Sequence, residues 1–448
     1  MKILTPARMV ALSFLCAILI GTVALSLPVA TQDAGRMPLV DSLFTATSAT
    51  CVTGLIVRDT GSYFTTFGRW VIFLLFQIGG LGIMTFSTLF AVMLGRKIGF
   101  SEDEIIRSTL NRQNLIGLKK LILYILGITF AVEITGAVLL YLRWRAITDW
   151  AFFETVERAL FHSVSAFCNA GFSLFRTSFV RFEGDAFING IMISIIVIGG
   201  IGFVVIMDVL GLFFKRGNAR RISLQAKIAL TVSIILILAG ACVLLFFERG
   251  NVMEGMSLPR RLWGSVFQSV TARTAGFNTL PIGKLTVPSL MFLMFLMFIG
   301  ASPGSTGGGI KTCTFAVLVM TVWSMLKNRK RVMMFNRSIS MKVIRQSLVI
   351  FFLSAAWVFI FTLILAYLRA TVYGNGISLV RVAFEVFSAF GTVGLSTGIT
   401  GDLGNLSKLC IIATMFAGRV GPLTLALAVA FRGKSDRYFY PEEKVMVG

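Results

Sequence analysis

The sequence predicts an all-α membrane protein in which eight transmembrane helices form four helix–pore loop–helix repeats with fourfold pseudo-symmetry around one central pore. Three observations predict this fold. The composition is the first: of 448 residues, 56% are hydrophobic and only 14% are charged, which is typical of a chain that crosses a membrane many times. The others are a set of eight apolar runs and a short motif that occurs four times.

Each apolar run is long enough, or nearly so, to cross a hydrocarbon core, which takes about 20 residues. The runs cover 9–29, 66–94, 118–142, 187–214, 226–247, 287–323, 345–368 and 405–431. The first run follows Lys2 and Arg8, as the apolar part of a secretory signal does. It is long for a signal, however, and Pro28 is a poor cleavage residue, so we expect a retained first span.

Basic residues gather in alternate connections between these runs. The two termini and segments 95–120, 214–227 and 327–345 hold 24 of the 42 Lys and Arg residues. By the positive-inside rule, both termini and these three connections are expected in the cytoplasm, which agrees with an even number of spans. Because the basic residues flank apolar runs, the net charge of +22 does not indicate nucleic-acid binding.

A motif of Phe, then Ser-Ala or Thr-Ala, then Gly occurs four times. It reads FTATSATCVTGL at 44–55, FHSVSAFCNAGF at 161–172, FQSVTARTAGF at 267–277 and FEVFSAFGTVGL at 384–395. The third copy is one residue shorter between the hydroxyl residue and the glycine. A second echo follows each copy: IGGLG at 78, IGGIG at 198, IGASPG at 299 and AGRVG at 417. The expected repeats are 1–98, 99–217, 218–330 and 331–448, the last including a C-terminal tail.

The stretch before each motif glycine is too short and too polar to span a membrane and lies between two spans, which favours a re-entrant pore helix. Irregular backbone at membrane depth is tolerated only where protein or a water-filled cavity surrounds it, so four such turns predict a shared pore. Glycine allows the chain to turn and to aim carbonyls at one axis. The alternative is that these glycines are helix-packing positions.

Rings of carbonyl oxygens can replace the hydration shell of a potassium ion, and the C-terminal ends of four pore helices favour a cation. The motifs place no Asp or Glu beside their glycines, which argues against a filter of acidic side chains. The predicted potassium filter consists of Val52, Thr53, Gly54, Asn169, Ala170, Gly171, Thr274, Ala275, Gly276, Thr392, Val393 and Gly394.

The stretch GASPGSTGGGIKT at 300–312 nearly spells a phosphate-binding loop. Ile310 separates its last glycine from Lys311, and an apolar helix precedes it where a phosphate loop follows a buried strand. An ATPase is therefore not expected. An intramembrane enzyme would need a nucleophile and base or a metal cluster in one cavity, and the dispersed carboxylates and single histidine do not supply one. We expect no enzyme and no organic cofactor.

With these motifs the chain resembles, over essentially its whole length, the Ktr/Trk/HKT superfamily of potassium transporters, most closely the bacterial Ktr-type membrane subunit. The resemblance implies potassium uptake across the bacterial cell membrane, a homodimer, and a cytoplasmic nucleotide-binding ring that regulates it. It also implies that segment 302–312 is an intramembrane gate. The gate residues would be Ser302, Pro303, Gly304, Ser305, Thr306, Gly307, Gly308, Gly309, Lys311 and Thr312, with Arg419 against them.

Proline and clustered glycines cannot continue a stable helix, which suits a gate, although a kink packed against a neighbouring helix is the alternative. Arg419 inside a span is costly and so is expected to have a task, either a contact with the gate or a tie to helix-end carbonyls. The basic connections are expected to meet the regulatory ring or anionic lipid.

A sodium-permeable or sodium-coupled transporter of the same fold is the nearest alternative, with sodium as activator or co-ion. An organic-solute carrier is less consistent with four repeats in the same sense, because such carriers often use inverted repeats. In plant relatives, a serine at the position of the first filter glycine accompanies sodium transport. This chain has a glycine there, Gly54, which favours potassium.

Four further polar residues and the cysteines have expected structural roles. Arg273 would brace the third pore helix, and Glu133 and Asp208 would make polar contacts between helices. His162 would be a hydrogen-bonded scaffold residue, because no second ligand stands at metal-binding spacing. The six scattered cysteines would be free thiols.

Overall fold

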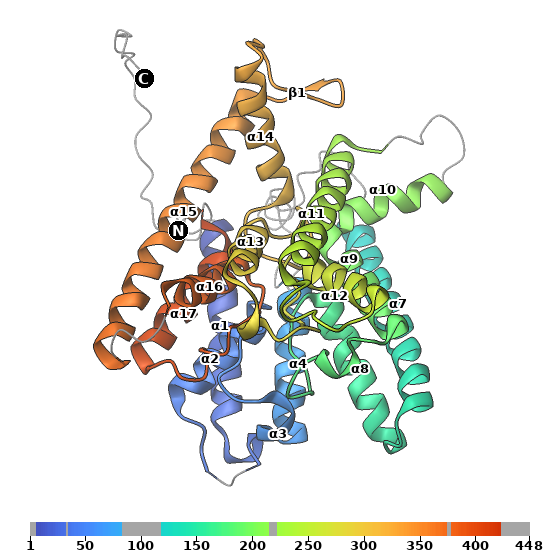
Figure 1. Cartoon of the computed structure of the whole chain (residues 1–448), viewed down its shortest axis with the longest axis vertical. Coiled ribbons are helices and arrows are strands. Elements are labelled where there is room, and N and C mark those ends of the chain that lie inside the picture. Colours follow the sequence, from blue (N-terminus) through green and yellow to red (C-terminus); the bar gives the residue numbers. More distant parts are fainter. Residues whose placement is uncertain (1–5, 33–34, 83–117, 215–221, 374–377, 423–448) are drawn as a thin grey trace.

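The computed structural model describes residues 6–32, 35–82, 118–214, 222–373 and 378–422. This part of the chain is predominantly helical (Figure 1). Its main helices are α1 (Pro6–Ser26), α2 (Leu39–Thr50), α3 (Thr60–Tyr63), α4 (Thr66–Leu81), α7 (Leu118–Ile147), α8 (Phe152–Cys168), α9 (Ala186–Ile201), α10 (Phe203–Phe214), α11 (Leu224–Glu248), α12 (Leu258–Thr271), α13 (Val287–Phe298), α14 (Thr312–Leu326), α15 (Met341–Tyr373), α16 (Leu379–Gly391) and α17 (Asn405–Val420). A small hairpin of β1 (Met333–Met334) and β2 (Arg337–Ser338) joins α14 to α15.

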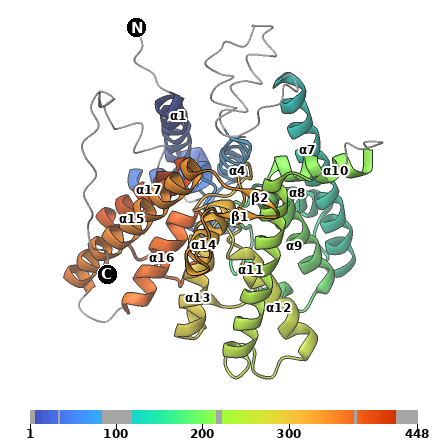
Figure 2. The same cartoon turned by 90° about the horizontal axis from the view of Figure 1, so that it is seen from above.

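The order long helix, short helix, second helix occurs four times along the chain. The short helices are α2, α8, α12 and α16, and each packs against the long helix before it. Their C-terminal halves are almost entirely buried. Seen from above, the four sets follow one another around the molecule, from α1 and α4 through α7–α9 and α11–α13 to α15–α17 (Figure 2).

Within the described residues, three helical stretches are long and apolar enough to cross a membrane: Ile122–Ile147, Leu224–Glu248 and Met341–Ala370. A fourth span would require α9 and α10 together, but these helices meet at an angle of 102°. The sequence predicted one continuous apolar run over 187–214 and did not predict that two helices would meet there at a sharp bend. The chain turns at Gly202, whose φ of 97° no right-handed helix accommodates.

The second helices of the first and fourth sets end in the same way. Gly82 and Gly421, which cap α4 and α17, have φ angles of 77° and 90°. Together with Gly202 they are the last glycines of the IGGLG, IGGIG and AGRVG segments. The echo is visible in the sequence, but a helix break was predicted only in the third set. The bend at Gly202 and the helix ends at Gly82 and Gly421 were therefore missed.

Polar side chains cap the starts of several helices. Thr65 and Ser223 accept backbone N–H groups at the starts of α4 and α11, and Asp185 accepts two N–H groups at the start of α9. Such residues satisfy N–H groups that have no partner within the helix.

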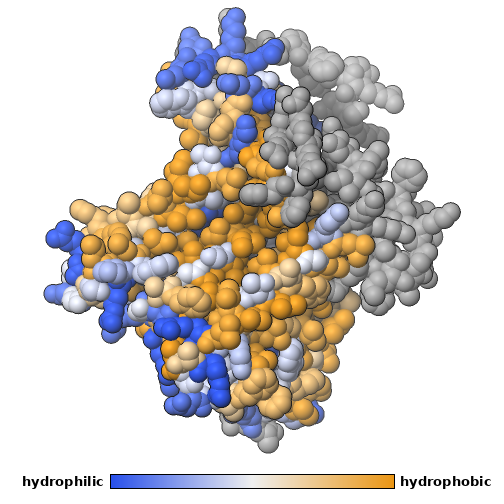
Figure 3. Space-filling view, turned by 90° about the vertical axis from the view of Figure 1, so that its right-hand side faces the viewer, coloured by the Kyte–Doolittle hydropathy of each residue, from blue (hydrophilic) through white to orange (hydrophobic). Residues whose placement is uncertain are grey.

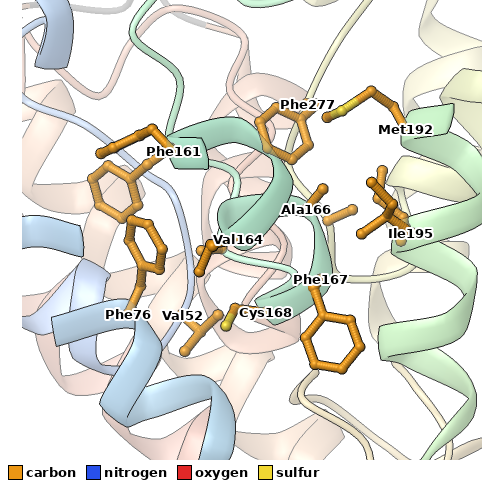
Figure 4. Close-up of a cluster of buried hydrophobic side chains, with 14 of the residues drawn as sticks. Val52, Phe76, Phe161, Val164, Ala166, Phe167, Cys168, Met192, Ile195 and Phe277 are labelled. Atoms are coloured by element: carbon orange, nitrogen blue, oxygen red, sulfur yellow. The ribbon is translucent and has the colours of Figure 1, made fainter. Parts of the chain in front are cut away.

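The largest core cluster surrounds the C-terminal half of α8. Figure 4 shows Phe76 and Phe161 on one side of this helix and Phe167, Met192 and Ile195 on the other. The outer surface is also apolar: a broad hydrophobic band crosses the face in Figure 3, with hydrophilic residues gathered toward its ends. An apolar exterior over a packed interior is what a hydrocarbon environment requires.

Candidate functional site: four glycine turns and a broken helix

Each short helix ends in a turn of the same backbone shape. A residue with positive φ comes first, one residue follows, and a glycine with positive φ completes the turn. The pairs are Val52 and Gly54, Asn169 and Gly171, Thr274 and Gly276, and Thr392 and Gly394, with φ angles from 49° to 93°. We call these segments, 52–54, 169–171, 274–276 and 392–394, the glycine turns.

Local hydrogen bonds explain this shape. In the second turn, the N–H groups of Asn169 and Ala170 donate to the carbonyls of Ala166 and Ser165 at 3.1 and 2.7 Å. The first and fourth turns repeat this pattern, which is the Schellman motif that ends many helices. In the third turn, Ala275 donates to Thr271, four residues back instead of five. The third motif, which is one residue shorter, therefore also has a hydrogen bond that spans one residue less.

Positive φ is unusual for the non-glycine residues of these turns. Asparagine tolerates it, but a β-branched residue such as Val52, with φ of 57°, is an outlier. Such conformations cost about 1–3 kcal/mol each and tend to occur at functional sites.

The four glycines meet one another in cyclic order. A Cβ added to Gly54 would lie within 3.0 Å of the Ala170 carbonyl oxygen, and one added to Gly171 would lie as close to the carbonyl of Ala275. The series continues from Gly276 to the carbonyl of Val393 and from Gly394 to the carbonyl of Thr53. In every case the carbonyl belongs to the residue just before the next glycine. Only glycine fits these positions, because of both the positive φ and the space.

The hydroxyl residue of each motif ties its turn to its helix in three of the four copies. Ser48 and Ser165 donate to the carbonyls of Leu55 and Phe172, at 2.7 and 2.8 Å, and Ser388 accepts the Gly394 N–H at 3.1 Å. Thr271, in the shortened third copy, is buried, and among the described residues its hydroxyl has no hydrogen-bond partner.

In the second and fourth copies, the residue three positions before the hydroxyl residue supports the chain after the turn. His162 accepts the Leu174 N–H at 3.2 Å through Nε2 and places Nδ1 2.7 Å from the Arg158 carbonyl. Glu385 accepts from Ser396, Thr397 and Thr400. His162 is thus a hydrogen-bonded scaffold residue, as predicted. The role of Glu385 was missed, although its offset within the repeat matches that of His162 and could have indicated it.

The predicted gate segment lies between α13 and α14, and residues 299–311 form what we call the α13–α14 loop. The N–H groups of Ser302 and Thr306 donate to Gly200 and Gly199, at 3.0 and 3.4 Å. In return, Phe203 at the start of α10 donates to the Gly304 carbonyl at 3.0 Å. The bend after α9 is therefore shaped around this loop.

The loop also bonds within itself. The hydroxyls of Ser302 and Thr312 lie 3.0 Å apart, Ser305 donates to the Ser302 carbonyl at 2.6 Å, and Lys311 Nζ donates to the Gly307 carbonyl at 2.5 Å. The loop lies against the glycine turns, because Gly308 N–H donates to Thr392 Oγ1 at 3.0 Å.

Arg419, on α17, connects the α13–α14 loop to the end of α4 by hydrogen bonds. Its guanidinium donates to the carbonyl of Thr306 in the α13–α14 loop and to the carbonyl of Gly79 near the end of α4. A guanidinium is always charged and suits such a bridge between carbonyls. The two expectations for Arg419, a contact with the loop and a tie to helix-end carbonyls, describe the same pair of bonds.

The other predicted polar residues connect helices. Arg273 donates to Ser233 on α11, at 3.0 Å to the hydroxyl, which braces the third short helix. Glu133 on α7 accepts from Gln77 on α4 at 3.0 and 3.2 Å. Asp208 on α10 accepts the N–H of Ser223 at 3.3 Å and also its hydroxyl. The predicted polar contacts between helices are confirmed for these residues.

The cysteines are free thiols, as the sequence predicted. Among the described residues, no group of three or more His, Cys, Asp or Glu side chains is arranged to hold a metal ion. All twelve predicted filter residues and all eleven predicted gate residues lie in described segments and together form one continuous region.

Long apolar helices around a buried region of glycine turns and broken helices define a helical membrane protein with an irregular backbone at its centre. Residues 7–440 match the TrkH family, described as cation transport protein. The chain belongs to this family, which is a family of transporters.

Relatives of the chain carry related descriptions. It is 37% identical to the Ktr system potassium uptake protein B of Bacillus subtilis, over 99% of this chain and 97% of that protein. It is 35% identical to the potassium/sodium uptake protein NtpJ of Enterococcus hirae, over 100% and 98%. The structure resembles the potassium transporter TrkH from Vibrio parahaemolyticus with a TM-score of 0.71 and 20% identity, over 93% of this chain and 84% of that one.

Proposed function

We propose that this chain carries potassium ions into the cell through a filter made of the four glycine turns. The observation that carries the proposal is their closed cyclic contact, in which each glycine faces the carbonyl before the next glycine. Successive peptide oxygens around one axis can replace the water around a potassium ion. The short helices end at the same place, so their partly negative C-terminal ends favour a cation there.

The driving force would be the membrane potential. About 100 mV, negative inside, favours entry of one positive charge by about 2.3 kcal/mol, which is roughly fifty-fold accumulation. The expected repeats are 1–98, 99–217, 218–330 and 331–448, with eight spans around the filter and fourfold pseudo-symmetry. The second spans of these repeats would contain the breaks after α4, α9, α13 and α17.

The α13–α14 loop would act as a gate beside the filter. Its contact with Thr392 and its bond from Arg419 place it against the turns, and two basic side chains, Lys311 and Arg419, bond to its carbonyls. A cytoplasmic nucleotide-binding ring would release it. Both termini would be cytoplasmic, and the protein would be a homodimer in the bacterial cell membrane.

A sodium-permeable or sodium-coupled transporter is the second candidate, because one relative is described as a potassium/sodium uptake protein. The purified chain in proteoliposomes distinguishes the candidates. With an inward-negative potential, we expect potassium influx to exceed sodium influx by at least about tenfold. Equal influx of both ions, or potassium influx that requires a sodium gradient, would favour the second candidate, and no cation influx at all would contradict both.

A further inference from the structure

Side chains of the glycine turns contact the α13–α14 loop at three successive residues. The residues concerned occupy the first, positive-φ position of the turns in the second, third and fourth copies: Asn169, Thr274 and Thr392. They are expected to contribute their carbonyls to the filter. Their side chains contact the loop, and these contacts are separate from the role of the carbonyls.

Asn169 contacts Thr306. The Thr306 hydroxyl oxygen lies 3.1 Å from the Asn169 amide and 3.2 Å from the carbonyls of Phe167 and Gly199. With the amide nitrogen directed at the Ala166 carbonyl, the amide oxygen accepts from both Thr306 and the Gly200 N–H. Both residues are fully buried, so these bonds are formed away from water, where leaving them unmade is costly.

Thr392 and Thr274 contact the next two loop residues. Thr392 Oγ1 accepts the Gly308 N–H at 3.0 Å. A Cβ added to Gly307 would be too close to Thr274 Oγ1, and one added to Gly308 would be too close to Thr392 Oγ1. Glycine at 307 and 308 therefore permits the loop backbone to approach both hydroxyls. The Thr274 hydroxyl is buried and has no hydrogen-bond partner in the part of the chain that the structure describes.

The first turn reaches the same part of the loop indirectly. Val52 packs against Gly79, where an added Cβ would lie 2.8 Å from Val52 Cγ2. The Gly79 carbonyl accepts from Arg419, which also donates to the Thr306 carbonyl. Residues 306–308 thus contact three of the turns directly, and Arg419 connects them to the segment against which the first turn packs.

We propose that the side chains of Asn169, Thr274 and Thr392 form a latch that couples docking of the α13–α14 loop to the geometry of the filter. The latch rests on the proposed function of the turns and adds to it. Each of these residues offers its carbonyl to the filter and its side chain to the loop from one Cα atom. A backbone movement of one of these turns therefore shifts both its filter carbonyl and its side-chain contact with the loop.

Coupling of this kind is reciprocal. If docking of the loop favours the ion-binding shape of the turns, then an ion bound between the turns favours docking of the loop by the same factor. Asn169, Thr274 and Thr392 are positioning residues in this scheme, since their side chains act on the loop and through it on the path of the ion.

Thr392→Val tests the latch with little change in shape. Valine already occupies the corresponding position of the first turn, where Val52 has a φ of 57° against 49° for Thr392. The change leaves the buried Gly308 N–H without its acceptor when the loop is docked. We expect potassium influx of the purified chain, without any regulator, to rise about tenfold, which corresponds to about 1.4 kcal/mol. The control is Thr414→Val, which removes a buried hydroxyl that bonds only to Cys410 within α17.

Hydrogen exchange measures the coupling itself. In the wild-type protein, amides of residues 302–311 should exchange more slowly in potassium than in an equal concentration of choline. The difference should be at least halved in Thr392→Val and unchanged in Thr414→Val. A role of Thr392 in stability alone would speed exchange equally in both salts, and this outcome would overturn the proposal, as would exchange in the wild type that does not depend on potassium.

A second variant tests the latch from the loop. Gly308→Ala places a methyl group against Thr392 and the Gly418 carbonyl, and it should raise influx and reduce potassium-dependent protection in the same way. Gly127→Ala, where the added atom meets open space, is its control. Wild-type protein that carries potassium while both latch variants behave like their controls would overturn the latch alone. Wild-type protein that carries no potassium would overturn the proposed filter.

Discussion

The glycine turns and the α13–α14 loop are both built on glycine, but they are held in different ways. Each turn is fixed mainly by its own helix, for example by the bonds from Ala170 to Ser165 and from Ser165 to Phe172. The loop has some bonds of its own, but many of its partners lie on other sets of helices, including Gly200, Thr392 and Arg419.

This difference bears on what each region can do. Bonds within one helix and its turn persist when the sets of helices move relative to one another, so each turn keeps its overall shape and is altered only through contacts from outside, such as those of the loop. Bonds between repeats are lost when those repeats separate, so the loop can leave its place without unfolding any helix. A selective element and a releasable element can therefore be made from similar residues by changing where the hydrogen-bond partners lie.

The largest expected effect is on the glycines of the turns. Gly54→Ser and Gly394→Ser add a Cβ where the carbonyls of Ala170 and Thr53 already lie. The displaced carbonyls should lower the preference for potassium over sodium by at least about tenfold, since roughly 1.4 kcal/mol of ion discrimination suffices for this change. Flux ratios in proteoliposomes measure it.

Gly401→Ser is the matched control, because a Cβ there would lie 3.9 Å from its nearest neighbour, the Val57 carbonyl. Unchanged ion preference after serine substitution at each of the four turn glycines would show that the turns are not the filter.

Removal of residues 304–309 should have the next largest effect, and on a different quantity. The deletion eliminates the bonds of Thr306 and Gly308 to other repeats and is expected to raise potassium influx in the absence of a regulator by about tenfold or more. Ion preference should change less than in the glycine variants, because the turns keep their own bonds. Influx that still depends on the regulator to the same extent would contradict the gate.

The sequence predicted the four turns because each is a local structure with a local signal. The copies share a hydroxyl residue and a glycine at a fixed separation, and the shorter third copy is the one whose bond pattern differs. The break at Gly202 and the contacts of Asn169 with Thr306 were not predicted. They depend on which residues of distant repeats face one another, and no local pattern of the chain records such a pairing. The contact of Arg419 with the loop was expected only through the family resemblance and the cost of a buried charge.

Glu133 supports the second turn from behind, and its removal should lower stability. Gln77 donates to both carboxylate oxygens of Glu133, and the Cys168 thiol at the end of α8 donates to the side-chain amide oxygen of Gln77 at 3.2 Å. In Glu133→Gln, two amide groups face each other, which should reduce the free energy of unfolding by about 1–3 kcal/mol. Denaturation in detergent measures this change. The double variant Glu133→Gln with Gln77→Glu restores a donor facing a carboxylate and should recover most of the loss; failure to recover would mean that other contacts of Glu133 dominate.

The smallest expected effect is a difference in the free energy of unfolding between variants of the third turn and variants of the other turns. Ser165→Ala removes the donor to the Phe172 carbonyl, and Ser48→Ala removes the donor to the Leu55 carbonyl. Each should lower the free energy of unfolding by about 1 kcal/mol. Thr271→Val removes a buried hydroxyl that has no partner and keeps the shape of the side chain, so stability should stay the same or rise. Denaturation of the three variants under one condition compares them directly. If Thr271→Val cost as much as Ser165→Ala, the third turn would be tied to its helix like the others, and its shorter motif would have no energetic consequence.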